Sequence, residues 1–185
     1  MPKDVAVRPQ ADAEASRLVP LLRETRTESG RTLIELIDAR PVLLIFLRHF
    51  GCSFCRQTLD DVSKVHSELE KRDVQVVFVH LGSPERAKPF FDFYRLTVVE
   101  RISDPEGKLY AAPAFRLARV STLQLIRPAV WIAWLKGAIF SYRVGLIKED
   151  MYQMPGVFFM RDRRIVNLFR HRTIADRPNY LALIS

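Results

Sequence analysis

The sequence predicts an α/β protein in which a central mixed sheet is flanked by helices. Residues 42–47 and 74–79 are almost continuously apolar, as expected of strands that are buried on both faces of a sheet. Near the C-terminus, residues 156–160 and 164–169 are separated by a charged turn at 161–163, which predicts a β-hairpin. Strands that alternate with helical segments and then end in a hairpin indicate an α/β layer.

The helical segments are recognised by their spacing and by their first residues. After the first strand, apolar residues recur at helical spacing from Leu59 to Leu69. After the second strand, Ser83 and Pro84 are residue types preferred at the N-cap and the first position of a helix. The other elements are expected at residues 11–26 (helix), 33–37 (short apolar element), 98–102 (short strand), 104–115 (helix) and from 176 onward (final helix).

The chain is expected to form one domain that covers residues 1–185. Its 185 residues, 48% of them hydrophobic, are enough to bury one core, and no internal repeat divides them. Residues 1–27 are interpreted as an N-terminal helical extension. Because they lack the long apolar run of a secretory signal, a cytoplasmic location is expected.

The formal net charge of +8 is unevenly distributed. Residues 1–100 are balanced, so the whole excess lies in residues 101–185, with arginines densest at 161–172. A basic half can attract nucleic acid, but these residues are scattered among apolar ones and no binding motif accompanies them. We therefore interpret them as a solvated basic face and expect no nucleic-acid partner.

Residues 120–149 are expected to form a helical insert. Within it, residues 128–142 are apolar almost all round and include Trp131 and Trp134. A bilayer span takes about 20 mostly apolar residues, so this is not a convincing transmembrane helix. The insert is interpreted as a cover for the sheet or the active-site mouth, or as the face of a homodimer. Attachment to a membrane surface through the tryptophans is the weaker alternative.

The predicted chemistry depends on Cys52 and Cys55, the two cysteines of the chain. Gly51 breaks the first strand just before them, so the pair lies where a buried strand passes into a helix. The N–H groups and the positive end of the helix dipole favour thiolate over thiol there, and Arg48 and Arg56 are expected to add to this effect. We expect Cys52 to be the nucleophile and Cys55, one turn further in, to resolve the mixed disulfide.

Other interpretations of the cysteine pair are weaker. A zinc site needs four ligands, and the four histidines are dispersed without paired spacing. A structural disulfide here would close a loop too small to stabilise much. No metal and no cofactor are therefore expected. His49 and His171 are candidates for acid–base assistance, although a histidine that simply packs at the edge of the fold is the favoured interpretation.

With these features the chain resembles the peroxiredoxin-like proteins of the alkyl hydroperoxide reductase and thiol-specific antioxidant (AhpC/TSA) group, within the thioredoxin superfamily. The resemblance extends from about residue 25 to the end, and residues 46–56, 79–82, 102–105 and 154–172 carry it. It implies a thioredoxin-like fold with a peroxiredoxin-type extra strand and helix. It also implies an antioxidant oxidoreductase that acts through thiol chemistry.

The resemblance gives Pro155 a supporting role. In thioredoxin-like folds a cis-proline precedes the strand that leads into the final hairpin, and it packs opposite the dithiol. Only about 5–6% of X–Pro bonds are cis in general. The prediction that Pro155 is this cis-proline therefore depends on its position, and an ordinary turn proline is the alternative.

The resemblance leaves two activities open. Peroxiredoxins hold their peroxidatic cysteine in the pattern Pro-x-x-x-Thr-x-x-Cys. With Cys55 in that role, Cys52 stands in the threonine position and Arg48 in the proline position; with Cys52 in that role, His49 and Ile45 fill them. Because the pattern is broken either way, exchange between dithiol and disulfide is favoured. A slower thiol peroxidase with a sulfenic acid intermediate is the alternative.

The expected partners follow from this chemistry. The substrate is a protein disulfide or a peroxide, and a thioredoxin- or glutathione-type reductant restores the dithiol. An alternative of a different class is a redox-inert thioredoxin-fold interaction module that docks through the helix of Trp131 and Trp134. The enzyme is favoured, because an exposed, acidic dithiol is chemically hard to leave idle.

Overall fold

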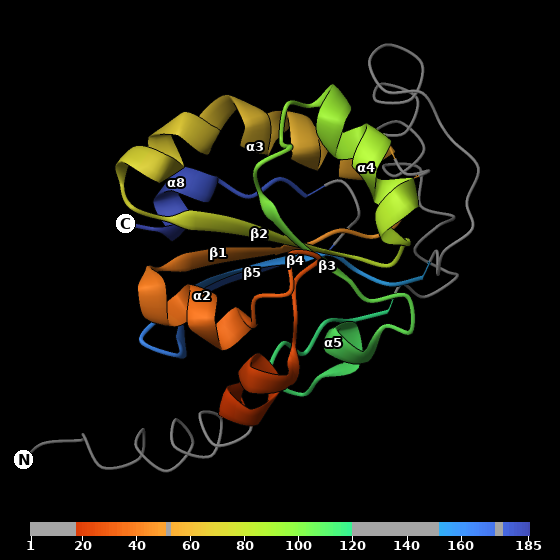
Figure 1. The fold of residues 1–185 in the computed structure, drawn as a ribbon. Helices are drawn as coiled ribbons and strands as arrows, with labels where there is room; N and C mark the ends of the chain where they lie inside the picture. The colour runs from red at the N-terminus through yellow and green to blue at the C-terminus, as the bar shows by residue number, and fades with distance from the viewer. Residues whose placement is uncertain (1–17, 51–52, 120–151, 173–175) are drawn as a thin grey trace, which may run out of the picture.

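The structure, a computed structural model, describes residues 18–50, 53–119, 152–172 and 176–185 (Figure 1). Residues 18–24 are helical. The labelled elements are, in chain order, α2 (Leu33–Ala39), β1 (Val42–Phe46), α3 (Ser53–Lys71), β2 (Gln75–His80), α4 (Pro84–Phe93), β3 (Glu100–Ser103), α5 (Lys108–Ala111), β4 (Gly156–Arg161), β5 (Arg164–Arg170) and α8 (Tyr180–Leu183).

The strands of the described chain form one mixed sheet in the order β3-β2-β1-β4-β5. β1 pairs in parallel with β2, and β2 pairs in parallel with β3. β4 is antiparallel to both β1 and β5, so the predicted hairpin joins the sheet beside its central strand. The prediction of an α/β protein with a mixed central sheet is confirmed.

β1 is the central strand, and all five of its side chains are buried. Because side chains alternate between the faces of a strand, Leu43 and Ile45 face one core, shared with α3, α4 and α8. Leu44 and Phe46 face a second core, shared with α2, α5 and the helical residues before α2. Figure 1 shows α3, α4 and α8 on one side of the sheet and α2 and α5 on the other. Burial on both faces explains the unbroken apolar run of this strand.

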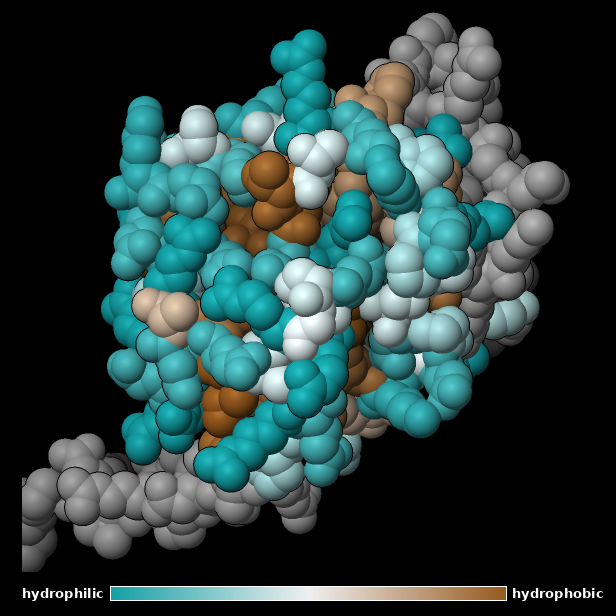
Figure 2. Space-filling model, viewed as in Figure 1, coloured by the Kyte–Doolittle hydropathy of each residue, from teal (hydrophilic) through white to brown (hydrophobic). Residues whose placement is uncertain are grey.

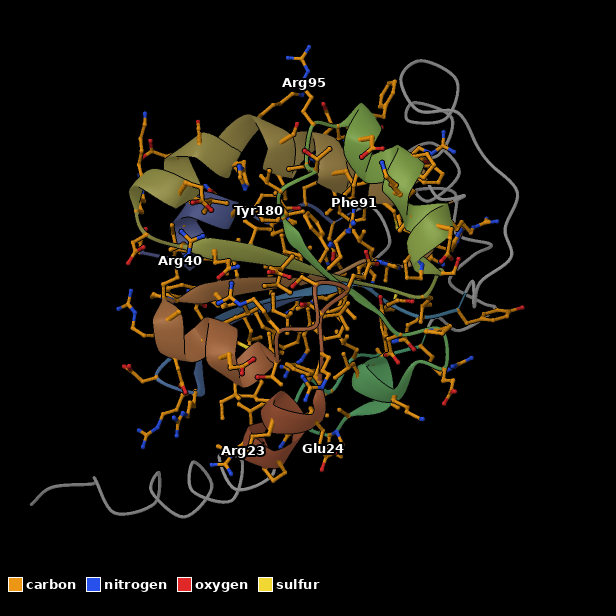
Figure 3. All side chains as sticks on the ribbon, in the orientation of Figure 1. Arg23, Glu24, Arg40, Phe91, Arg95 and Tyr180 are labelled. Atoms are coloured by element: carbon orange, nitrogen blue, oxygen red, sulfur yellow. The ribbon has the colours of Figure 1, made fainter. Side chains whose placement is uncertain are left out.

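The polar and apolar side chains are sorted between surface and interior. The face shown in Figure 2 is largely hydrophilic, and apolar side chains are visible mainly in hollows between polar ones. In Figure 3, Arg23 and Arg95 extend outward, whereas Phe91 and Tyr180 lie between the helices and the sheet. Among the residues that the structure describes, no helix is both long enough and apolar enough to cross a membrane.

Two helices begin with side-chain caps. The Ser83 hydroxyl accepts the N–H of Arg86, and Pro84 opens α4, as predicted. Thr32 and Glu35 form a reciprocal capping box at the start of α2. The short apolar element predicted at residues 33–37 is therefore a helix.

The helix predicted for residues 104–115 is wrong in its length, because only α5 forms there. Gly107 adopts a left-handed conformation with φ of 68° just before α5. Pro113 disfavours the helical conformation at the preceding residue, so α5 ends early. Asp104 caps the short helix by accepting two backbone N–H groups, at 2.9 and 2.8 Å.

The final helix also differs from its predicted start at residue 176. Pro178 disfavours helix at the residue before it, and the Asn179 side chain accepts the N–H of Ala182 at 3.1 Å, which places the N-cap at Asn179. The helix predicted for residues 11–26 is described only from residue 18 onward. The insert predicted at 120–149 lies outside the described residues.

Candidate active site

Cys55 lies in the first turn of α3, directly after the loop that leads out of β1. Its Sγ atom accepts a hydrogen bond from the backbone N–H of Arg48 at 3.2 Å, and the residue is 4% exposed. The donated N–H and the helix start both favour negative charge on the sulfur. The other two residues predicted here, Gly51 and Cys52, lie outside the described residues.

A buried tyrosine of α5 holds the loop before Cys55. The hydroxyl of Tyr110 donates to the backbone carbonyl groups of Leu47 and Val79, the second at 3.0 Å. Burial raises the pKa of Tyr110 well above its ordinary value, so the phenol stays protonated and remains a donor. Tyr110 thereby fixes the chain one residue before Arg48, whose N–H binds the Cys55 sulfur.

Replacing Tyr110 with phenylalanine is expected to lower the free energy of unfolding by about 1–3 kcal/mol, because a buried carbonyl group loses its donor. The ring contact with Phe46, at 5.0 Å between centroids, is retained, so no large cavity forms. Urea unfolding measures the change, and Tyr94→Phe, at the half-buried residue that directly follows α4, is the matched control. A Tyr110→Phe protein as stable as the wild type would contradict this role.

The two arginines predicted to support the site hold its neighbouring segments. Arg48 is 4% exposed, and its Nε atom donates to the carbonyl oxygen of Gln153 at 2.9 Å, which joins the loop to the segment before β4. Arg56 donates from Nε to the carbonyl oxygen of Phe50 at 3.2 Å, and its guanidinium lies 5.2 Å from the centroid of the Phe90 ring. Arg48 thus holds the segment before β4, and Arg56 holds the end of the loop that follows β1.

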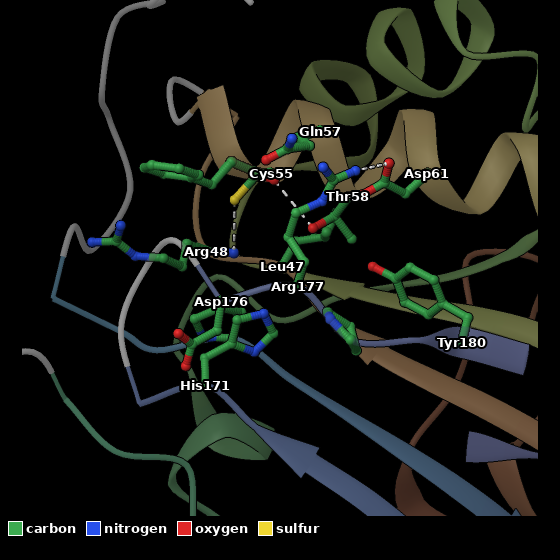
Figure 4. Close-up of a pocket in the computed structure, with 13 residues that line it drawn as sticks. Leu47, Arg48, Cys55, Gln57, Thr58, Asp61, His171, Asp176, Arg177 and Tyr180 are labelled. Carbon is green, nitrogen blue, oxygen red and sulfur yellow. Dashed lines mark hydrogen bonds and ion pairs between the residues drawn. The ribbon is translucent and has the colours of Figure 1, made fainter. Parts of the chain in front are cut away.

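A pocket opens beside Cys55, between the start of α3 and the segments that flank β4, β5 and α8 (Figure 4). Arg177 closes one side of it through a bidentate ion pair with Asp61 of α3, at 2.5 and 3.1 Å. Its walls combine apolar residues such as Leu47 with polar ones such as His171. Cys55 thus borders a pocket although its side chain is almost entirely buried.

Pro155 lines the same pocket as Cys55, but the predicted cis bond is wrong. No peptide bond among the described residues is cis. The bond between Met154 and Pro155 is therefore trans. The chain passes directly from Pro155 into β4, where Gly156 pairs with Phe46 of β1. A trans bond is the ordinary geometry for such an extended entry.

Several residues of the pocket were not predicted from the sequence. Cys55, Thr58 and Asp61 are three residues apart in α3, so helical spacing alone predicts that they lie on one face of the helix. Arg177 lies 116 positions from its partner Asp61, and nothing local indicates the pair. His171, expected to pack at the edge of the fold, lies in the pocket wall.

The residues around the sulfur suggest no metal centre. Across the ranges that the structure describes, no group of three or more His, Cys, Asp or Glu side chains is arranged to hold a metal ion. The chemistry available at this site is that of a thiol with backbone donors and polar neighbours.

The sheet combines the parallel strands β1–β3 with the antiparallel β4–β5 hairpin, and Cys55 lies in the first turn of α3, the helix that follows β1. This arrangement defines the class of thioredoxin-fold thiol proteins. Comparison with known families gives the particular member of this class. The model of the AhpC/TSA family matches residues 22–168. The chain belongs to the AhpC/TSA family.

Individual proteins support this assignment. Peroxiredoxin-like 2C of Bos taurus is 29% identical over 85 residues, which are 44% of this chain and 37% of that protein. The match thus spans little more than a third of that relative's length.

Solved structures share the fold. Peroxidoxin BcpB from Mycobacterium tuberculosis superimposes with a TM-score of 0.57 at 16% identity, covering 82% of each chain. Peroxiredoxin Q from Xanthomonas campestris gives 0.60 at 13% identity, covering 86% of this chain and 85% of that one. A secreted disulfide oxidoreductase of M. tuberculosis, homologous to E. coli DsbE, gives 0.53 at 17% identity, covering 91% and 94%. At these identities the likeness establishes the fold.

Proposed function

We propose that this protein is a thiol–disulfide oxidoreductase in which Cys52 attacks the substrate and Cys55 resolves the mixed disulfide. The whole chain of residues 1–185 acts as one thioredoxin-like domain in this proposal. The substrate is a protein disulfide, and a thioredoxin- or glutathione-type reductant restores the dithiol. Membership of the AhpC/TSA family supports thiol redox chemistry as the class of activity.

The hydrogen bond from the Arg48 N–H to the Cys55 sulfur carries this proposal. When Cys55 is aligned with a peroxidatic cysteine, Arg48 stands in the proline position of the peroxiredoxin pattern. Proline has no N–H to donate, whereas Arg48 donates to the sulfur at 3.2 Å. Arg48 therefore supplies a donor that stabilises Cys55 both as an attacking thiolate and as a leaving group.

The exchange balances in two steps. The Cys52 thiolate attacks one sulfur of the substrate disulfide, so that a mixed disulfide forms and the first substrate thiolate leaves. The Cys55 thiolate then attacks the Cys52 sulfur, which forms the Cys52–Cys55 bond and releases the second substrate thiolate. The protein loses two electrons, and the substrate disulfide gains them.

A thiol peroxidase is the second candidate, because the buried Cys55 lines a pocket beside the start of α3. One cysteine thiolate would attack a peroxide oxygen, giving a sulfenic acid and an alcohol or water. The other cysteine would then displace water from the sulfenic acid and form the same disulfide. Both candidates thus end in the Cys52–Cys55 bond and differ in the oxidant.

The test is stoichiometric oxidation of the reduced protein, by a peptide disulfide in one series and by a hydroperoxide in another. Intact-mass spectrometry is expected to record the loss of two hydrogens, and peptide mapping is expected to join Cys52 to Cys55. The rate with the disulfide is expected to exceed the rate with the peroxide. Protein alkylated at both thiols beforehand is the control.

Two results would overturn the proposal. If neither oxidant forms the Cys52–Cys55 bond, the dithiol function is wrong. If the hydroperoxide reacts faster than the disulfide, the peroxidase replaces the disulfide reductase as the function.

A further inference from the structure

His171 is a buried polar side chain in the Cys55 pocket for which the exchange described above has no use. It directly follows β5, is 9% exposed and lines the pocket. Its Nδ1 atom is buried and makes no hydrogen bond to the described part of the chain. Buried polar atoms in this state are rare and call for an explanation.

The surroundings of His171 keep its ring neutral. Burial is the largest influence and lowers the pKa of His171, and the charge of Arg48 lowers it further. The Asp176 carboxylate and hydrogen bonding to the backbone of Pro155 and Asp176 act in the opposite direction without reversing the shift. A neutral imidazole has a lone pair that accepts a proton, and Asp176 stabilises the cation that results.

His171 and Cys55 line the same pocket, and Arg48 lines it too. The Arg48 N–H binds the Cys55 sulfur at 3.2 Å. In Figure 4, Cys55, Arg48 and His171 follow one another along the pocket. Both the sulfur and the imidazole therefore open to the same small volume.

The other titratable groups that face this pocket are poorly suited to take a proton. Asp61 is held in the bidentate ion pair with Arg177. Burial raises the pKa of Tyr180, so its phenol stays protonated. Asp176 accepts the backbone N–H of Arg172 at 2.7 Å.

We propose that His171 accepts the proton of Cys55 when Cys55 attacks the mixed disulfide. The proposal rests on the proposed dithiol function and assigns one residue to its second step. The Cys55 S–H bond breaks, its proton passes to His171, and the sulfur forms the bond to Cys52. The substrate thiolate leaves Cys52, and the imidazolium then returns its proton to solvent.

The two steps are separated by a nitroaryl disulfide whose thiolate product is coloured. Mixed in excess with the reduced protein in a stopped-flow instrument, it releases one thiolate when Cys52 attacks and a second when Cys55 resolves. His171→Gln is expected to slow the second release by about 100-fold and to leave the first unchanged. Added imidazole is expected to restore part of the lost rate. His66→Gln, on the part of α3 that lies away from the pocket, is the matched control and is expected to behave as the wild type.

The pH profile distinguishes proton transfer from a structural role. In the wild type, the rate of the second release is expected to rise through one ionisation below the ordinary range for histidine, and this ionisation is expected to be missing in His171→Gln. Equal slowing of both releases, or an unchanged pH profile in the variant, would overturn the role of His171. Absence of the second release from the wild type itself would instead overturn the proposed dithiol function.

Discussion

Replacing Cys52 with serine is expected to lower the rate of disulfide reduction by several orders of magnitude, because a serine hydroxyl is not an effective nucleophile toward sulfur. The Cys55→Ser variant is expected to behave differently. Its Cys52 still attacks, but nothing resolves the product, so the mixed disulfide with the substrate accumulates. The pair of variants therefore assigns the two roles independently.

Single-turnover kinetics and intact-mass spectrometry measure this difference. Cys55→Ser is expected to gain the mass of one substrate thiol in a rapid first step, whereas Cys52→Ser is expected to stay unmodified on the same timescale. Because serine is close in volume to cysteine, both variants are expected to fold, and circular dichroism checks this. Full activity of Cys52→Ser, or a substrate adduct on Cys55 in that variant, would contradict the assigned roles.

The fold was predictable because its signals are local. The apolar run of β1 and the Ser83-Pro84 start of α4 are contained within a few adjacent residues, and the structure places a strand and a helix there. The length of α5 was predicted wrongly because the same kind of local signal was followed there. The sequence 104–115 has a good helix start, but the left-handed Gly107 and the restriction imposed by Pro113 shorten the helix.

The pocket was less predictable because its walls meet only in three dimensions. The sequence placed the cysteine motif where a strand passes into a helix, and the structure has Cys55 in the first turn of α3. By contrast, Arg177 and Asp61 are 116 positions apart, and His171 comes to the pocket from the far end of the hairpin. The direction of the Arg48 N–H toward the sulfur depends on how Tyr110 fixes the loop, which no local pattern encodes.

A largely buried ionic cluster at the carboxyl end of β2 also depends on residues that are distant in the sequence. Glu28, in the loop before α2, lies 2.9 Å from His80 Nε2 and accepts Arg101 Nε at 2.9 Å. His80 is 1% exposed, and its Nδ1 lies 2.9 Å from the carbonyl oxygen of Gly82. The carbonyl oxygen of Gly82 and the ionised Glu28 carboxylate only accept hydrogen bonds, so each ring nitrogen of His80 faces an acceptor. Glu28 thus joins His80 of β2 to Arg101 of β3.

Replacing Glu28 with glutamine is expected to lower the free energy of unfolding by about 2–3 kcal/mol, because it leaves the largely buried Arg101 without its counter-charge. This loss is small for a broken buried ion pair, because the glutamine side chain still accepts a hydrogen bond. Urea unfolding at neutral pH measures the loss. The exposed Glu24→Gln in the same segment is the matched control and is expected to change the stability little.

Acid removes the same contribution from the wild type. Burial on its own would raise the pKa of Glu28, but the hydrogen bond from His80 and the charge of Arg101 outweigh it and hold the pKa below its ordinary value of 4.5. The stabilisation is therefore complete above pH 4.5 and is lost as the pH falls through the lower folded value. Since other carboxylates also titrate there, the difference between wild type and Glu28→Gln isolates this group. That difference is expected to be constant from neutral pH down to 4.5 and to shrink below it; a difference that stays the same into stronger acid would mean that the Glu28 charge does not stabilise the fold.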